Sequence, residues 1–353
     1  MAALAAAGTL GASPAASASA SASAPLVEHA VSLPVIVSQY STIVVDVAAK
    51  RVFISGGASD DEIIVANLAG AIVGTISVPG AGGLALSPDG TTLYAALYND
   101  GEVAFINTST LKETTVVHIP TAFPDYLAYT DGDLWFSAGI TENGQLNGQG
   151  EIGAIDPATG KIVSTLLVSP YFSNGGLIAA SPLDPGLLLA ADNSEDPSTV
   201  YVYKISNGKL QLQVESNAWS TDYCAFPNGL TIDPDRKDVL VGCITPYRYS
   251  LTSYTADGSY PTGESALAVS SDGYVLFASD YLVPQITFTV FAADAAAPSA
   301  TYPENTLSSD ENSVVAVAFG ANHQSFYALE TTYSEISGAE ENSQLSTWAP
   351  STS

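Results

Sequence analysis

Basic side chains are scarce in this sequence: its 353 residues include 9 Lys and Arg against 36 Asp and Glu, for a net charge of −27. A chain this acidic repels the phosphates of nucleic acids and the headgroups of an anionic membrane surface. We therefore expect neither as a partner. Solubility is the simplest interpretation of the charge. A more specific one is that carboxylates gather on one face to hold cations or a cationic ligand.

Common catalytic motifs are missing as well. The sequence contains no GxSxG motif, no CxxC motif and no phosphate-binding loop. Its three histidines, His29, His118 and His323, lie far apart, which argues against a histidine-based metal cluster or catalytic triad. The acidic run at 192–196 lacks the spacing of an EF-hand loop. These absences favour a protein without catalytic activity.

Long hydrophobic runs are absent too, so no segment is expected to span a bilayer. Residues 1–24 form an Ala- and Ser-rich segment that is similar to the apolar and small-residue parts of a secretory signal peptide, although the first basic residue is Lys50. A disordered linker is the alternative for this segment. The signal-like composition predicts export, with the protein either secreted or retained at the cell surface.

Cysteine occurs only twice, as Cys224 and Cys243. In an exported chain such a pair usually forms a disulfide. Counting back from the turn at 233–238 places Asn228 opposite Cys243, and Cys224 lies four residues before Asn228. We therefore predict a disulfide between Cys224 and Cys243, closing a loop of about 20 residues and contributing roughly 3 kcal/mol. Two buried thiols are the alternative.

The sequence does contain a repeated pattern of short strands. Residues 82–120 hold four short apolar runs separated by three turn signals rich in Gly, Pro, Asn and Asp, a pattern typical of β-strands. Four such strands in about 40 residues match one blade of a β-propeller. The first run of this unit recurs seven times along the chain, at 42–45, 84–86, 127–129, 177–179, 230–232, 267–269 and 315–317.

Further runs complete the blades, and none shows the period of an amphipathic helix. Third strands are expected at 63–66, 103–106, 152–155, 200–204, 251–254, 286–291 and 344–348. The seventh unit ends after its third strand, whereas residues 26–35 resemble the fourth strands of other units. We therefore predict one all-β domain over residues 25–353, a seven-bladed β-propeller of four-stranded antiparallel blades. The N-terminal strand closes the ring in the last blade.

This pattern resembles the YVTN-type bacterial seven-bladed propellers, within a lactonase-like propeller superfamily. The resemblance rests on IVVDVAAKRVFIS at 43–55, LALSPDGTTLYAAL at 84–97 and IGAIDPATGK at 152–161, and it extends over about residues 26–349. It implies the propeller fold. It leaves the activity open, because propellers host many unrelated functions.

Long connections are expected to gather on one face of this propeller. Those predicted at 56–62, 138–151, 191–199, 243–250, 279–285 and 330–343 are rich in carboxylates, whereas the turns between first and second strands are short. Binding residues concentrate in such loops, although a solvated face with packing aromatics is the alternative. We predict a site for a small molecule, a glycan or a protein on this face, lined by Tyr98, Phe123, Tyr126, Phe172, Trp219, Tyr247, Tyr281 and Tyr333.

Polar residues just before the first strands are expected to ring the channel mouth on this face, and oxygen ligands of this kind suit Ca²⁺. The sequence FPNGL at 226–230 resembles the PNGL motif of the gluconolactonase family. That resemblance implies a metal bound by Asn228, together with Asp125 and Glu264. The chain departs from the family in lacking Glu-Gly-Pro in the first blade and in having Glu264-Ser265 where the family has Asp.

Two functions are compatible with these observations. The first is an exported, non-catalytic and monomeric propeller that acts as a binding or cell-surface interaction module, with or without Ca²⁺. The second is a Ca²⁺-dependent, lactonase-like hydrolase that uses Asp125, Asn228 and Glu264 around one ion. A surface array that associates through Ca²⁺ is a third possibility.

Overall fold

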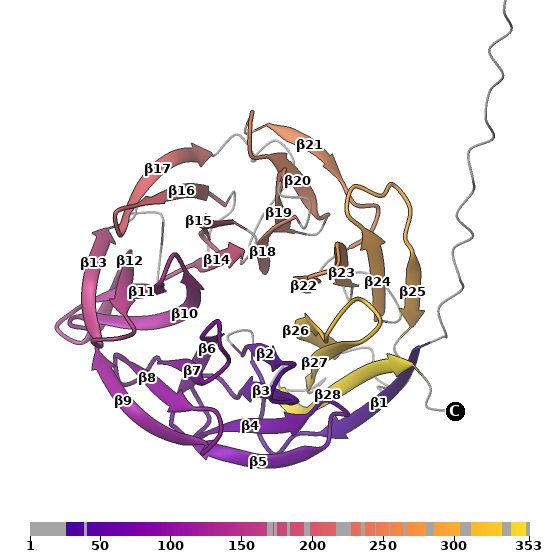
Figure 1. The fold of residues 1–353 in the computed structure, drawn as a ribbon, viewed down its shortest axis with the longest axis horizontal. Coiled ribbons are helices and arrows are strands. Elements are labelled where there is room, and N and C mark those ends of the chain that lie inside the picture. Colours follow the sequence, from indigo (N-terminus) through magenta and orange to yellow (C-terminus); the bar gives the residue numbers. More distant parts are fainter. Residues whose placement is uncertain are drawn as a thin grey trace, which may run out of the picture.

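The computed structural model describes residues 26–38, 41–167, 172, 175–181, 184–193, 198–216, 227–233, 237–243, 245–253, 255–263, 266–279, 286–303, 312–333 and 340–350. In these ranges the backbone forms strands β1 to β28 and no helix, hence no helix that is long and apolar enough to cross a membrane. The strands make seven sheets of four antiparallel strands. Figure 1 shows them as blades around a central axis, which confirms the predicted seven-bladed β-propeller.

Each blade runs from an innermost strand at the axis to an outermost strand at the rim (Figure 1). The innermost strands are β2 (Ile43–Asp46), β6 (Ala81–Leu86), β10 (Ala122–Thr130), β14 (Leu177–Ser181), β18 (Gly229–Ile232), β22 (Ala266–Val269) and β26 (Asn312–Phe319). The second strands are β3 (Arg51–Ser55), β7 (Thr92–Leu97), β11 (Asp133–Glu142), β15 (Asp184–Ala191), β19 (Asp238–Gly242), β23 (Tyr274–Ser279) and β27 (Phe326–Tyr333). The third strands are β4 (Glu62–Asn67), β8 (Glu102–Asn107), β12 (Gln145–Asp156), β16 (Val200–Ser206), β20 (Tyr247–Ser250), β24 (Thr287–Ala292) and β28 (Glu340–Pro350). The outermost strands are β5 (Ile72–Ser77), β9 (Lys112–His118), β13 (Lys161–Leu167), β17 (Lys209–Ser216), β21 (Ala256–Ser259), β25 (Ala300–Pro303) and, in the last blade, β1 (Leu26–Ser32).

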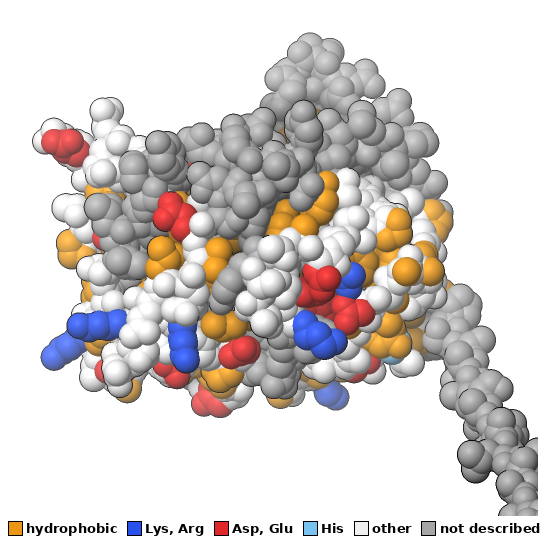
Figure 2. Space-filling view, turned by 90° about the horizontal axis from the view of Figure 1, so that it is seen from above, with side chains coloured by type: hydrophobic (Ala, Val, Ile, Leu, Met, Phe, Trp, Pro, Cys, Tyr) orange, Lys and Arg blue, Asp and Glu red, His pale blue; other side chains and the backbone are white. Residues whose placement is uncertain are grey.

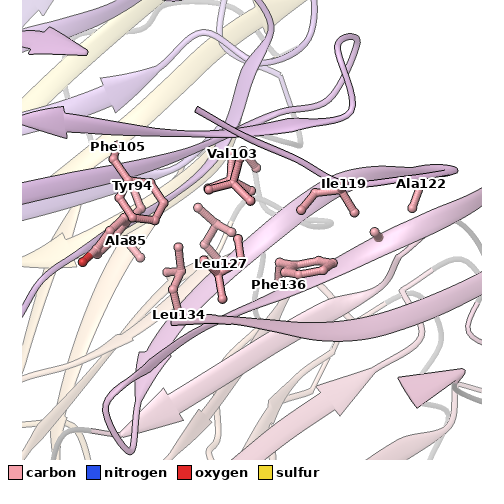
Figure 3. Packing of buried hydrophobic residues seen from close by; sticks show 13 residues of the cluster. Ala85, Tyr94, Val103, Phe105, Ile119, Ala122, Leu127, Leu134 and Phe136 are labelled. Atoms are coloured by element: carbon pink, nitrogen blue, oxygen red, sulfur yellow. The ribbon is translucent and has the colours of Figure 1, made fainter. Parts of the chain in front are cut away.

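The second strands are buried because neighbouring blades cover both of their faces. Along β7 the side chains alternate: Leu93 and Ala95 pack in an apolar cluster toward the first blade, and Tyr94 and Ala96 pack in another toward the third blade. Figure 3 shows the latter cluster, where side chains of the second blade meet Phe136 of the third. A strand whose side chains are apolar on both faces is therefore stable only where two neighbouring blades cover it.

The ring is closed by the N-terminal strand, as predicted. β1 pairs antiparallel with β28, from Leu26 opposite Pro350 to Ser32 opposite Gln344. The chain then crosses to the first blade, and Leu33, Val35 and the completely buried Val37 pack between the last blade and the first. Closure leaves β28 with a partner along both edges, and the outer edge of the last blade is that of the shorter β1.

The third strand of the fifth blade differs from its predicted position at 251–254. β20 ends at Ser250, and residues 251–253 form a turn. The segment has the composition of a loop, yet Tyr249 is buried between blades and Arg248 forms an ion pair with Asp294 of the sixth blade. Tertiary contacts that the local sequence does not reveal therefore make this segment a strand.

Three of the predicted long loops are partly regular strand, and one of them, 243–250, contains the whole of β20. The 138–151 connection continues β11 and β12 as a hairpin, which ends in a turn at Asn143 and Gly144 with φ of 55° and 78°. Positive φ at both positions defines a type I′ turn, which an Asn-Gly sequence favours. In the seventh blade, β27 extends to Tyr333 and β28 begins at Glu340. The prediction of irregular structure was wrong for these residues.

Candidate functional site

A cavity of about 890 Å³ lies at the axis of the propeller, lined by residues from all seven blades. Most of them are the first residues of innermost strands or the residues just before these strands. Because the innermost strands begin on the face that carries the long connections, the cavity opens on the face predicted for binding. The described lining residues are Ser41, Thr42, Ile43, Ala58, Gly82, Tyr98, Asp125, Tyr126, Leu146, Leu177, Ile178, Asn193, Pro227, Asn228, Gly229, Leu230, Ala266, Leu267, Ser313, Val314, Val315, Ala316, Val317 and Tyr333.

Asp125 is the one carboxylate among these lining residues, and a β-bulge places it there. The register of β10 shifts between Pro124 and Leu127, so that Asp125 and Tyr126 together lie opposite Ser137. A bulge of this kind redirects a side chain out of the regular alternation. The Tyr126 N–H donates a hydrogen bond to Ser137 Oγ at 3.3 Å, which fixes the bulge.

The carboxylate of Asp125 is buried without compensation. Only 6% of the residue is exposed, and no described residue donates a hydrogen bond to its side chain or forms an ion pair with it. Burial disfavours the charged form and raises the pKa of Asp125 to about 8. The cavity therefore holds a carboxyl group whose charge is costly unless a further group neutralises it.

Gly83 of β6 lies directly against the backbone of this bulge. A Cβ at Gly83 comes within 2.4 Å of the Asp125 carbonyl oxygen and 2.8 Å of the Tyr126 Cα. Because backbone atoms have little freedom to move, we expect Gly83→Ala to destabilise the fold by about 1–3 kcal/mol in chemical unfolding. Gly74→Ala is the matched control, since its nearest neighbour is Leu111 Cδ1 at 3.5 Å. Equal effects of the two substitutions would contradict this account of the bulge.

Three of the predicted aromatic residues line the cavity. Tyr98, Tyr126 and Tyr333 enter from the second, third and seventh blades. The amide of Asn193 donates to the Tyr126 hydroxyl at 3.3 Å, which orients that ring. Phe123 packs against Tyr98 with 5.3 Å between ring centroids and so supports the rim.

Two other predicted aromatic residues do not reach the cavity. Phe172 is completely buried and packs edge-on against Tyr201 between the third and fourth blades, so its prediction as a binding residue is replaced by a core role. Tyr247 is half-buried on β20, beside Tyr249, and is not part of the lining. The remaining predicted positions, Trp219 and Tyr281, lie outside the described residues.

The predicted metal ligands are brought together in part. Asp125 and Asn228 both line the cavity, whereas Glu264 lies outside the described residues. Within the described ranges no group of three or more His, Cys, Asp and Glu side chains is placed to hold a metal ion. Ca²⁺ takes six to eight oxygen ligands. One carboxylate and one amide supply few of them, and the predicted Ca²⁺ site stays a prediction.

Only one of the two cysteines of the predicted disulfide lies among the described residues. Cys243 is buried, with 2% of its surface exposed, directly after β19 and close to the channel mouth. Cys224 lies outside the described residues, so the disulfide stays a prediction.

The described Lys and Arg side chains lie toward the end of the molecule opposite the cavity. Each described one is in or near the short turns that join first to second or third to fourth strands, or is paired with a carboxylate of such a turn. Figure 2 shows those in view confined to the lower part of the molecule. Carboxylates occur on both faces, so the cavity end is the more negative one. The described Lys and Arg residues are Lys50, Arg51, Lys112, Lys161, Lys204, Lys209, Lys237 and Arg248.

Sequence reasoning missed two contributors to this cavity. Leu146 reaches it from the β11–β12 hairpin, and Asn193 reaches it from the residues after β15. The Asn-Gly turn at 143–144 was a signal for the hairpin, since this dipeptide favours two-residue turns. Asn193 has no local signal, because its role depends on Tyr126 of the neighbouring blade.

Comparison with known proteins supports the fold. No family model matches the chain, and no curated protein matches its sequence. A chain of the solved structure titled "Crystal Structure of Mitotic Checkpoint Complex" is similar, with a TM-score of 0.68 over 96% of this chain and 96% of that chain, at 12% identity. At this identity the similarity concerns the backbone arrangement alone. The chain is thus a β-propeller, and its membership of the YVTN-type family stays a prediction.

Proposed function

We propose that this protein is an exported binding module that holds a small polar ligand in the cavity at the channel mouth. The observation that carries the proposal is the cavity itself, to which all seven blades contribute and which contains a buried carboxyl group without a partner among the described residues. Concave sites of this size, with apolar walls and a few polar groups, are typical of small-ligand sites. The Ala- and Ser-rich residues 1–24 support export to the outside or the surface of the cell.

The rival proposal is a Ca²⁺-dependent, lactonase-like hydrolase. It is favoured by one observation, that Asp125 and Asn228 line the same cavity. In this alternative Asp125, Asn228 and Glu264 hold the ion, and the ion polarises the ester carbonyl of the lactone. The two proposals differ in whether binding needs a metal and whether a product appears.

A ligand screen on the purified full chain tests the binding proposal. We expect members of a small-molecule and glycan panel to raise the melting temperature, and the hits to bind saturably in calorimetry. Asn228→Trp places a large side chain at an exposed position of the lining and should abolish this binding, whereas Lys161→Trp, exposed on the opposite face, should retain it. Binding that is unchanged in Asn228→Trp would place the ligand elsewhere.

The same protein, treated with a chelator and then supplied with Ca²⁺, decides between the two proposals. The binding module keeps its ligand affinity after chelation and leaves lactones intact. The hydrolase opens lactones only when Ca²⁺ is restored, and Asp125→Ala and Asn228→Ala remove that activity. Ca²⁺-dependent lactone hydrolysis would overturn the non-catalytic proposal.

A further inference from the structure

Resting on the proposed function and going beyond it, we propose that the ligand of this cavity carries an organic ammonium group, which binds against the carboxylate of Asp125. Three independent features of the described residues point to this class of ligand: the carboxylate without a partner, the tyrosines that share its cavity, and the separation of charge between the two faces of the propeller.

The first feature is the carboxylate. Buried charged groups in proteins are nearly always neutralised by an opposite charge and by hydrogen bonds. Asp125 has neither among the described residues, and none of the described lining residues is Lys or Arg. The residue lines the cavity. A positively charged group that enters the cavity therefore supplies the opposite charge that the described residues do not provide for Asp125.

The second feature is the aromatic lining. Tyr98, Tyr126 and Tyr333 contribute to the same cavity, and Tyr126 follows Asp125 directly in the bulge of β10. The face of an aromatic ring attracts an ammonium ion, and quaternary ammonium groups are commonly held by several rings. The hydrogen bond from Asn193 to the Tyr126 hydroxyl keeps one of these rings in position before a ligand arrives.

The third feature is the electric field at the cavity end. The described Lys and Arg side chains lie toward the opposite face, whereas the loops and strand ends around the cavity carry exposed or half-exposed carboxylates such as Asp61, Glu102 and Glu142. A surface of one sign around a recess raises the local concentration of ions of the opposite sign and speeds their entry. Anionic ligands are disfavoured at the same mouth.

A monocation fits the described lining better than a divalent metal does. Asp125 offers one negative charge, which a single ammonium group neutralises. Ca²⁺ requires six to eight oxygen ligands, usually including several carboxylates. The volume of about 890 Å³ also leaves room for an organic body beyond the ammonium group, which the apolar walls of Leu177, Leu230 and Val314 can contact.

Matched pairs of probes that differ only in charge test the inference. Choline and its uncharged carbon isostere 3,3-dimethylbutan-1-ol form the first pair, and acetylcholine and its carbon isostere 3,3-dimethylbutyl acetate form a second, larger pair. In calorimetry on the full chain we expect at least one ammonium probe to bind at least tenfold more tightly than its neutral partner. Equal binding of both members, or no binding by any ammonium probe, overturns the inference.

Variants of the chain complete the test. Asp125→Asn keeps the shape of the side chain and should weaken ammonium binding at least tenfold. Glu113→Gln removes one charge from an exposed position at the start of β9, toward the opposite face, and should leave binding within twofold. If the panel yields a neutral or sugar ligand that Asn228→Trp excludes, the binding module stands and the ammonium inference fails. If no compound binds at all, the proposed function fails with it.

Discussion

Removal of β1 is expected to lower the melting temperature of the propeller far more than removal of the residues that precede it. β1 forms the outermost strand of the last blade, and its pairing with β28 joins the two ends of the described chain. Loss of the strand leaves the outer edge of β28 unpaired from Gln344 to Pro350, in one of the longest described strands. The last blade then holds three strands instead of four.

The size of the effect follows from what each truncation removes. β1 contributes backbone hydrogen bonds along seven residues, and each contributes about 0.5–1.5 kcal/mol net. Truncation before Leu33 should thus cost on the order of 3 kcal/mol or more. Truncation through Val37 also removes buried Leu33, Val35 and Val37 and should cost several kcal/mol beyond that, at about 1.5–3 kcal/mol per buried side chain.

A series of three truncations provides the control. The chain that lacks residues 1–25 keeps β1 and should melt like the parent, while those that lack 1–32 and 1–37 should melt at successively lower temperatures. The two shorter chains should also self-associate in size-exclusion chromatography, because an unpaired strand edge is a template for further pairing. Identical melting of all three would show that the ring is held closed by contacts other than β1.

The parts of this fold that the sequence predicted are those that follow from local pattern. A second strand such as β7 is apolar on both faces and is bounded by turn residues, so its burial between two blades follows from its own residues. The closing strand was predictable for the same reason, as an apolar run without a unit of its own. The third strand of the fifth blade was predicted at the wrong position because Arg248 interrupts its apolar pattern. Arg248 is held there by tertiary contacts, among them the ion pair with Asp294 of the sixth blade and a hydrogen bond to the Asp257 carbonyl.

The candidate site was predictable in position but not in detail. The polar residues before the innermost strands identified the channel mouth, and with it Asp125 and Asn228. The burial of Asp125 depends on a bulge and on the close approach of Gly83 from the neighbouring blade, which no local pattern encodes. Phe172 was misassigned because an aromatic residue in a connection has the same sequence pattern whether it lines a cavity or fills a core.

Asp125→Asn is expected to change how the stability of the protein depends on pH. The folded state raises the pKa of this carboxyl from 3.8 to about 8, because burial disfavours its charged form. A raised pKa means that the folded state binds the proton more tightly than the unfolded state does. Asp125 therefore contributes stability that is fully present below about pH 4 and is lost as the pH rises toward 8.

Within this window the folded chain holds one proton that the unfolded chain has released, so the free energy of unfolding falls by about 1.4 kcal/mol per pH unit from this group alone. Asparagine does not ionise, and Asp125→Asn removes that slope. The variant should be close to the parent in stability near pH 4.5 and more stable by several kcal/mol near pH 8. Other carboxylates with raised pKa values, such as Asp60 and Glu151, contribute equally to both proteins and cancel in the difference.

Urea unfolding of the parent and the variant at intervals from pH 4.5 to 8.5 measures this difference. Glu142→Gln, at an exposed position on the same face, is the control for the loss of one negative charge. An ammonium ligand that binds Asp125 should reverse the effect, because it favours the ionised carboxylate and restores stability at high pH in the parent but not in Asp125→Asn. Parallel stability curves for parent and variant would mean that the carboxylate is already solvated by water or paired with another group, and the cavity would then need no cation.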